Sequence, residues 1–349
     1  MVDIDNLNIP TKSSMGLIML SSMKGFGRVA IKKIIDNFDT IADFISADDS
    51  NLDILNIKQR ENIRDSVFVN TAYNTSKEQH NKIAEIGASI ISLYDDAYPK
   101  RLRGISDAPL VLYAAGDMSI LENGLAFVGT REPTDFGQKV ARGMSYAAAE
   151  DGHCIVSGLA RGVDAVCHNA AVDAKGTTCA VLASGLDLYT SDIAMKLAQR
   201  ILENGGLLIT EQPLGAEANR GSYIARDRLI TGLSLATFFI QGEAHSGSMH
   251  SVRYAISQNR PVYVPNIPER FLSEQINETA RNLGILTVGQ IASKFDWTGR
   301  VMEVVNKNPD ATAASLVMNR DDYPRVFEEI KNPKSAVLEP IDSTPIASP

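Results

Sequence analysis

Short apolar stretches between residues 125 and 265 lead into loops that are rich in glycine, serine and threonine. Small residues let main-chain N–H groups approach an anion, and the amino end of a following helix adds positive partial charge. Each loop alone has a plainer explanation, because a tight turn between a strand and a helix also requires glycine. Several such loops together favour a phosphate-bearing ligand, either a nucleotide or a nucleic-acid backbone. The loops read GTREPTDFG, SGLARGVDAVCH, SGLD, EQPLG and GEAHSGSMHS.

Basic side chains are concentrated in residues 220–260, where five arginines stand against two acids, Asp227 and Glu243. This stretch carries a net charge of +3 (five minus two) in a protein whose formal net charge is −8. Arginine forms paired hydrogen bonds with phosphate and stacks on bases or rings, and Tyr223 offers a ring nearby. The alternative is a set of surface salt bridges. The arginines are Arg220, Arg226, Arg228, Arg253 and Arg260.

The segment KGFGRVAIKK near the N-terminus holds four basic residues, no acid and two glycines, Gly25 and Gly27. Its Gly-x-Gly-x-x-Ala spacing is a weak dinucleotide fingerprint, because the flanks are helical and no second strand follows within about 30 residues. We interpret the segment as a turn between two short helices. Exposed N–H groups beside Lys24 and Arg28 suit phosphate contacts that ignore base sequence. The alternative is an ordinary helical turn with a solvated basic face.

Several patterns that mark catalytic or metal sites are missing from the sequence. It contains no P-loop and no Gly-x-Ser-x-Gly nucleophile motif, and the five histidines lack metal-ligand spacing. His168 follows an apolar helical pattern and is expected to be a packed, hydrogen-bonded histidine. We therefore expect no catalytic residue, no metal and no cofactor, and a binding protein in preference to an enzyme.

The composition is that of an ordinary soluble protein, with 44% apolar and 22% charged residues. No apolar run approaches the roughly 18 residues of a transmembrane helix. The first residues lack the basic and then apolar pattern of a secretory signal. The three cysteines form no Cys-x-x-Cys pair and suit a reducing compartment. We expect a cytoplasmic protein without a membrane partner.

Six apolar runs of four to seven residues alternate with helix-length segments in residues 125–265. This alternation predicts an α/β fold with a doubly wound, mainly parallel, Rossmann-like sheet. We expect a small helical domain in residues 1–75 and the extended Rossmann-like domain in residues 76–295. In residues 296–330, the segments VMEVVNKN, ATAASLVM and YPRVFEEI predict three short helices without a β-wing. Residues 331–349 predict a disordered tail.

A set of ordered motifs runs through roughly residues 10–290. The segments AYPKRLRGISDAPLVLYAAGD, FVGTREPTDFG, SGLARGVDAVCH, SGLD, TEQPLG, SYIARDRLITGLS and GEAHSGSMHSVRYAISQNRPVYVP follow one another. In this content and order the sequence resembles the DprA/Smf family of DNA-processing proteins. SGLARGVDAVCH is the most specific motif, because it matches the family's Ser-Gly-Leu-Ala-x-Gly-Ile-Asp-x-x-x-His almost residue for residue. KGFGRVAIKKII is similar to the helix-hairpin-helix, SAM-like module of many members.

The resemblance implies a basic pocket for single-stranded DNA in the Rossmann-like core. Lys175 is a candidate second basic contact. The sequence departs from the family at Asp227, which replaces a neutral amide between two arginines and puts DNA affinity in question. Residues 296–330 correspond to a reduced or divergent winged helix. By motif position, the pocket would be lined by Arg131, Ser157, Gly158, Arg226, Arg228, Ser246, Gly247 and Ser248.

The function that the resemblance implies is protection of single-stranded DNA and loading of a RecA-type recombinase during natural transformation (competence), by a homodimer. A phosphoribohydrolase-like enzyme is one alternative, with Glu243 as the acid and Arg226 as the phosphate clamp. Its Pro-Gly-Gly-x-Gly-Thr-x-x-Glu motif is absent here. A nucleotide-sensing protein is the other alternative. Release of free base would identify the enzyme, and saturable mononucleotide binding without release would identify the sensor.

Overall fold

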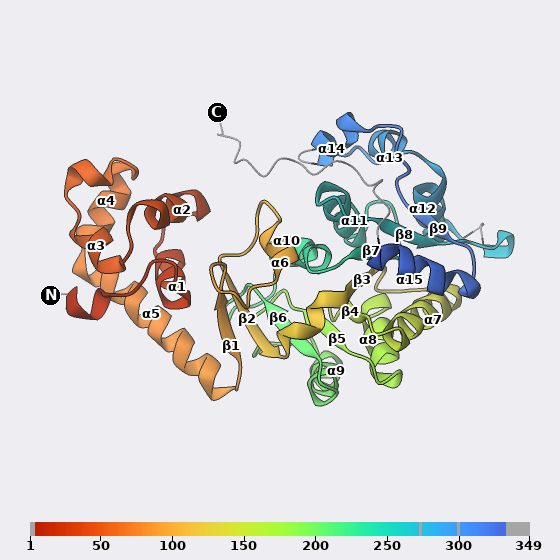
Figure 1. Ribbon diagram of the computed structural model, residues 1–349, viewed down its shortest axis with the longest axis horizontal. Coiled ribbons are helices and arrows are strands. Elements are labelled where there is room, and N and C mark those ends of the chain that lie inside the picture. The colour runs from red at the N-terminus through yellow and green to blue at the C-terminus, as the bar shows by residue number, and fades with distance from the viewer. Residues whose placement is uncertain (1–3, 272–273, 299–300, 333–349) are drawn as a thin grey trace. The chain divides into compact units, whose positions relative to one another are not determined.

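The computed structural model describes residues 4–271, 274–298 and 301–332, and the chain divides into two compact units (Figure 1). The first unit comprises Met1–Tyr98, Pro109–Ala114 and Glu211–Leu214. The second comprises Pro99–Ala108, Ala115–Thr210 and the described residues from Gly215 onward. The chain therefore passes between the units more than once, and the boundary that the sequence predicts after residue 75 falls inside the first unit.

The first unit is mainly helical. Its elements are η1 (Ile4–Leu7), α1 (Ser14–Ser22), α2 (Arg28–Asn37), α3 (Ile41–Ser46), η2 (Asp49–Leu52), α4 (Ile57–Arg64), α5 (Ser66–Glu85), β1 (Ser89–Ser92) and residues 111–114 of β2 (Val111–Gly116). The helices before α5 are short, and capping residues begin several of them: Ser13 caps α1, and Thr40 and Asn56 form capping boxes at α3 and α4. β1 pairs antiparallel with β2, with Ile90 opposite Tyr113.

The turn between α1 and α2 is the one that the sequence predicts. Gly25 has φ +94°, a left-handed conformation that favours glycine. The turn is fixed from α4, where the Gln59 Nε2 donates to the Gly25 carbonyl at 2.8 Å. Phe26 is buried and packs edge-on against Phe44, with ring centroids 6.4 Å apart. The glycines therefore lie on an exposed turn that a small apolar core supports.

The second unit is built on a parallel sheet, and all six apolar runs predicted to be strands lie in it. Its order is β6-β5-β4-β3-β7-β8-β9. The strands are β3 (Gly124–Val128), β4 (Cys154–Ser157), β5 (Thr178–Val181), β6 (Leu207–Thr210), β7 (Ala236–Phe239), β8 (Val262–Pro265) and β9 (Ser315–Val317). The predicted doubly wound, Rossmann-like α/β fold is confirmed. Every residue of the strands β3 to β8 is buried, because helices cover both faces.

Helices pack in two layers on this sheet, as Figure 1 shows. In one layer α8 packs against both α7 and α9, and in the other α10 packs against α11. The helices are α6 (Lys100–Arg103), α7 (Asp135–Glu150), α8 (Val163–Asp173), α9 (Asp192–Glu203), α10 (Arg220–Gly232), α11 (Ser248–Ser257), α12 (Gln275–Ile285), α13 (Val288–Lys294), α14 (Val301–Lys307) and α15 (Tyr323–Lys331), with the 3-10 turns η3 (Met118–Asn123), η4 (Glu269–Phe271) and η5 (Arg320–Asp322). The core between sheet and helices includes Phe127 and Phe238, whose stacked rings lie 4.8 Å apart.

The strand order reverses between β3 and β7, where open α/β sheets bind ligands beyond the carboxyl ends of the strands. Gln241 follows β7 and is fully buried there. Its amide accepts from the Thr134 main chain at 2.9 Å and donates to Asn277 at 2.6 Å. The reversal point is thus filled by a side chain that links β7, α7 and α12.

One helix predicted for the C-terminal segment is wrong. VMEVVNKN and YPRVFEEI contain α14 and α15, but ATAASLVM contains β9, which pairs parallel to β8 with Leu316 opposite Val264. The free edge of β8 presents unpaired main-chain groups, and pairing with them outweighs the helix preference of a short alanine-containing stretch. The predicted tail from residue 333 onward lies outside the described residues.

Candidate nucleic-acid interface

Arg226 on α10 reaches the loop that follows β4. The residue is buried, and its Nη1 donates to the carbonyl of Val181, the last residue of β5, at 2.8 Å. The guanidinium lies so close to Gly158 that a Cβ at this position would overlap Nη1. The glycine of the SGLARG motif is therefore required by the arginine packed against it.

The N–H groups of the same loop point at a carboxylate of the protein itself. Gly158 and Ala160 donate their main-chain N–H groups to Asp164 Oδ2 at 3.2 and 3.3 Å. Leu159 between them has φ +58°, the left-handed conformation that lets neighbouring N–H groups converge on one anion. The sequence favours a phosphate in this loop, but in the structure the Asp164 carboxylate accepts the hydrogen bonds of its N–H groups.

Two carboxylates, the buried Asp164 and the largely buried Asp227, share the guanidinium of Arg226. Asp227 Oδ1 lies 3.3 Å from its Nε, and Asp164 interacts with the same charge. Burial raises the pKa of Asp227 to about 7; Arg226 opposes this rise, whereas the negative Asp164 adds to it. Burial also raises the pKa of Asp164. One arginine cannot neutralise two buried carboxylates, so this cluster is expected to hold a proton near neutral pH.

Arg131 is an exposed cation beside this cluster. It follows β3, and its guanidinium lies over the ring of Tyr223 at 5.2 Å from the centroid. Tyr223 lies on α10, three residues before Arg226, so both arginines are held by one helix. The positive charge of Arg131 also acts on the cluster of Arg226, Asp227 and Asp164, because it lowers the pKa of Asp227. The pair offers a solvent-facing cation beside an aromatic ring.

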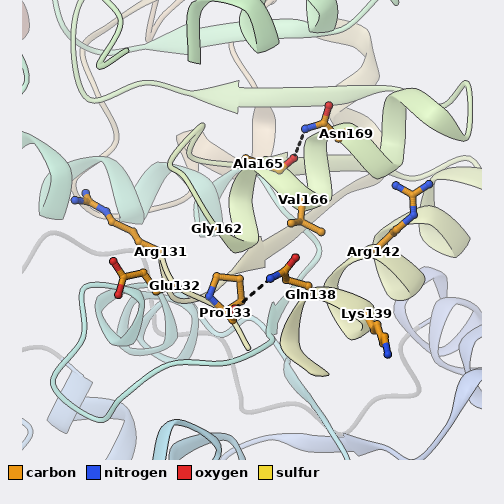
Figure 2. Close-up of a pocket in the computed structure, with 10 residues that line it drawn as sticks. All are labelled: Arg131, Glu132, Pro133, Gln138, Lys139, Arg142, Gly162, Ala165, Val166 and Asn169. Carbon is orange, nitrogen blue, oxygen red and sulfur yellow. Dashed lines mark hydrogen bonds between the residues drawn. The ribbon is translucent and has the colours of Figure 1, made fainter. Parts of the chain in front are cut away.

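An open pocket of about 690 Å³ adjoins Arg131 (Figure 2). The residues that line it come from the loop after β3, from α7 and from the start of α8. Figure 2 shows Arg131 and Arg142 on opposite sides of this pocket. The lining residues are Arg131, Glu132, Pro133, Gln138, Lys139, Arg142, Gly162, Ala165, Val166 and Asn169.

Residues 89–287 match the sequence profile of the family described as DNA recombination-mediator protein A. The matched stretch is more than half of the 349-residue chain. The chain belongs to this family. Protein Smf of Synechocystis is 32% identical over 265 residues, which are 71% of this chain and 64% of that protein. DNA processing protein DprA of Bacillus subtilis is 35% identical over 181 residues, 51% of this chain and 61% of that protein.

The chain thus spans less than two thirds of the length of these curated relatives. Among solved structures, DNA processing protein A from Streptococcus pneumoniae matches with a TM-score of 0.62 at 22% identity, covering 90% of this chain and 97% of that one. DNA processing protein A from Helicobacter pylori matches with a TM-score of 0.53 at 25% identity, covering 69% and 96%. These matches show that this member of the recombination-mediator family shares their fold.

The structure separates the two arginines that the family motif places together. Arg228 lies two residues after Arg226, and residues at this spacing do not share a helix face. Its Nε lies 3.1 Å from Asp107 in the segment after α6, and its Nη1 donates to the Ala225 carbonyl at 2.7 Å. Arg226 supports the loop after β4, whereas Arg228 is held on another side of α10.

The predicted serines use their hydroxyl groups internally. Ser157 is fully buried and donates to the Phe127 carbonyl at 2.7 Å, which ties β4 to β3. Ser246 donates to the Glu243 carbonyl at 2.6 Å and lies 2.8 Å from the Ser248 hydroxyl. Gly247 between them caps α11 without a side-chain bond. This loop follows β7, and its hydroxyl groups stabilise its own turn.

Two other predicted contacts lie elsewhere. Lys175 is exposed at the end of α8, ahead of β5, and therefore at the amino edge of the sheet, opposite Arg131 and the loop after β4. The four residues of the N-terminal turn belong to the first unit, where all are exposed. They are Lys24, Gly25, Gly27 and Arg28. The structure brings together Arg131, Gly158 and Arg226.

Some residues of this region cannot be recognised from the sequence alone. Asp164, which organises the loop after β4, stands in the SGLARGVD motif, but nothing local marks it as an acceptor for the N–H groups of that loop. Lys139 and Arg142 lie on α7 and Asn169 on α8, and no local pattern connects the two helices. An amphipathic α7 with cations on its polar face was the one available signal.

His168 is a packed histidine, as the sequence predicts. It is fully buried, and its Nδ1 lies 2.7 Å from the Thr178 hydroxyl. Burial, with a smaller effect of Arg226, lowers its pKa to about 3. In residues 4–271, 274–298 and 301–332, no three histidine, cysteine or acidic side chains are grouped so as to hold a metal ion. In the same residues, no helix is long and apolar enough to cross a membrane.

Proposed function

We propose that this protein binds single-stranded DNA at the carboxyl edge of its parallel sheet, through phosphate contacts that ignore base identity. The observation that carries the proposal is the exposed Arg131 guanidinium over the Tyr223 ring. A cation and a ring at one place suit a strand that presents phosphates and unpaired bases together. A duplex hides its bases, so this pairing favours the single strand.

The buried cluster beneath this contact fixes its position. Arg226 is anchored to Val181 and packs against Gly158, and it shares α10 with Tyr223. Rigid support lowers the entropy that DNA binding must overcome. Arg226 is therefore assigned as a positioning residue, and Arg131 as the residue that meets phosphate.

Relatives of the chain support this assignment. The structure of the Helicobacter pylori relative is described as giving insights into a unique single-stranded DNA binding mode. The Bacillus subtilis and Streptococcus pneumoniae relatives are called DNA processing protein DprA. We extend the proposal to a homodimer in the cytoplasm that protects single-stranded DNA and delivers it to a RecA-type recombinase in recombination or natural transformation. The reducing compartment is supported by three free, buried cysteines.

A binding role is favoured over the phosphoribohydrolase alternative by the contacts of Arg226. That enzyme needs a guanidinium free to clamp a phosphate. Here Nη1 is bound to a main-chain carbonyl, and the residue is only 5% exposed. Incubation with nucleoside monophosphates tests the alternative: release of free base would replace the binding proposal with an enzymatic one.

The direct test of the binding site is Arg131→Ala. Loss of one phosphate contact to a single strand at about 0.1 M salt corresponds to a roughly five-fold weaker affinity. We expect this loss to be equal for oligonucleotides of different base composition. Arg325→Ala on α15 is the control, because Arg325 is also exposed but pairs with Glu329. A loss that depends strongly on base composition, or an equal loss in the control, would reject the site.

A further inference from the structure

The pocket between α7 and α8 has a floor that is continuous with the Arg131 loop. Gly162 begins the α8 segment with φ +84°, and a Cβ there would lie 2.5 Å from the Thr130 carbonyl oxygen and 2.6 Å from that of Arg131. This glycine lets the loops after β3 and β4 touch. Arg131 belongs both to the contact with Tyr223 and to the lining of the pocket, so a ligand at that contact adjoins the pocket.

The residues that line the pocket and the charged residues paired with them carry a positive net charge. The lining holds three cations and one acid, Arg161 and Asp173 form ion pairs with lining residues, and Arg200 in turn pairs with Asp173. Five cations against two acids give a local charge of +3, in a protein of net charge −8. The cations are Arg131, Lys139, Arg142, Arg161 and Arg200, and the acids are Glu132 and Asp173.

Both acids are already bound by arginines. Glu132 lies 2.6 Å from Arg161. Asp173 lies 2.8 Å from Arg200 and 2.9 Å from Arg142, and these hydrogen bonds lower its pKa. Asp173 therefore holds arginines of α7 and α9 against α8, and the group keeps its net charge of +3 after both acids are counted. Lys139 makes no ion pair with another described residue, so its ammonium group is available to an anion.

The lining also indicates which part of a nucleic acid would lie here. None of the ten lining residues is aromatic, so the pocket offers no ring on which a base could stack. It offers cations beside Ala165 and Val166, while the amides of Gln138 and Asn169 already donate to the carbonyls of Pro133 and Ala165. Cations suit phosphate oxygens.

We propose that this pocket binds the sugar-phosphate backbone of nucleotides that extend beyond the Arg131 and Tyr223 contact. The inference rests on the proposed function and adds to it a second stretch of the DNA path. An acidic segment of another protein is the competing occupant. It is less suited, because the pocket is continuous with the contact proposed to hold DNA.

The test uses the full chain with a charge reversal at Lys139, which is exposed and outside the ion-pair network. Two labelled oligo-dT strands are compared, one of about six nucleotides, which fills the Arg131 contact, and one of about 20, which extends past it. Lys139→Glu should lower the affinity for the long strand roughly 25-fold at 0.1 M salt, because the substitution removes two units of positive charge. The short strand should bind as it does to the unmodified protein.

Lys139→Ala gives a second readout that a folding defect would not imitate. The salt dependence of its affinity for the long strand should be shallower by about 0.7 in log–log slope, the value for one phosphate contact. The matched control is Lys307→Glu, because Lys307 is also exposed but lies on α14, which packs against α11. Unchanged thermal unfolding of all variants confirms that they are folded.

Three results would overturn the proposal. They are an unchanged long-strand affinity in Lys139→Glu, an equal loss for the short strand, and an equal loss in Lys307→Glu. Failure of the proposed function itself would be distinct, because the unmodified protein would then bind neither strand. Binding of an acidic peptide that long oligo-dT cannot displace would assign the pocket to a protein partner instead.

Discussion

Asp227→Asn is the substitution with the most specific expected effect. The carboxyl group lies 3.3 Å from Arg226 and is influenced by the charges of Asp164 and Arg131. Burial raises its pKa to about 7, compared with an ordinary value of 3.8. Near pH 6 the group is mostly protonated, and near pH 8 it is mostly ionised. Ionisation subtracts one positive charge from the region that is proposed to meet phosphate.

The size of the effect follows from this single charge. One charge that no longer counts toward phosphate neutralisation corresponds to about 0.7 in the log–log salt slope for a single strand. At about 0.1 M salt this is a five-fold change in affinity, or about 1 kcal/mol. The unmodified protein should therefore bind oligo-dT about five-fold more weakly at pH 8 than at pH 6. The Asp227→Asn variant should bind oligo-dT equally well at pH 6 and pH 8, with the affinity that the unmodified protein has at pH 6.

The change of affinity with pH can be measured by fluorescence anisotropy with labelled oligo-dT at pH 6, 7 and 8 and constant ionic strength, for both the unmodified protein and the variant. Asp107→Asn is the matched control, because Asp107 pairs with Arg228 at 3.1 Å on another side of α10. It should keep the pH dependence of the unmodified protein. If Asp227→Asn retained the same pH dependence, the reasoning from the buried cluster would be refuted.

Three further outcomes follow from the same contacts. Gly158→Ala, which overlaps the Arg226 guanidinium, should lower the free energy of unfolding by about 1–3 kcal/mol in denaturant titration and weaken oligo-dT binding. Lys175→Gly should raise the free energy of unfolding by about 1 kcal/mol, because Lys175 has φ +57°, and should leave DNA affinity unchanged. His168 stays neutral in the folded protein down to a pKa of about 3, while the unfolded chain binds a proton below about 6.5. Stability should therefore fall with pH below 6.5 by up to about 1.4 kcal/mol per pH unit from this residue, and His168→Gln should remove that contribution.

The sheet of the second unit could be predicted from the sequence because its signal is local. Runs such as LAFVG and TTCAVLA are continuous and apolar, as strands buried on both faces must be. β9 could not be predicted in this way. It forms because β8 offers a free edge, and the three residues Ser315–Val317 carry no periodicity of their own.

The candidate site was predictable in its location and less so in its details. Arg131 and Gly158 stand in motifs directly after strands, where ligands of open α/β sheets bind. The different roles of Arg226 and Arg228 depend on which side of α10 each one faces, and the roles of Asp164 and Lys139 depend on how loops and helices pack. These are tertiary contacts, and a single sequence does not reveal them.

The most direct test of the central claim is the affinity of the full chain for labelled oligo-dT, compared with a duplex of equal length, at about 50 and 200 mM salt. The account predicts tighter binding of the single strand, with an affinity that falls about 20-fold between these salt concentrations if three phosphates are contacted. No binding at the lower salt concentration, or equal affinity for the duplex, would contradict it.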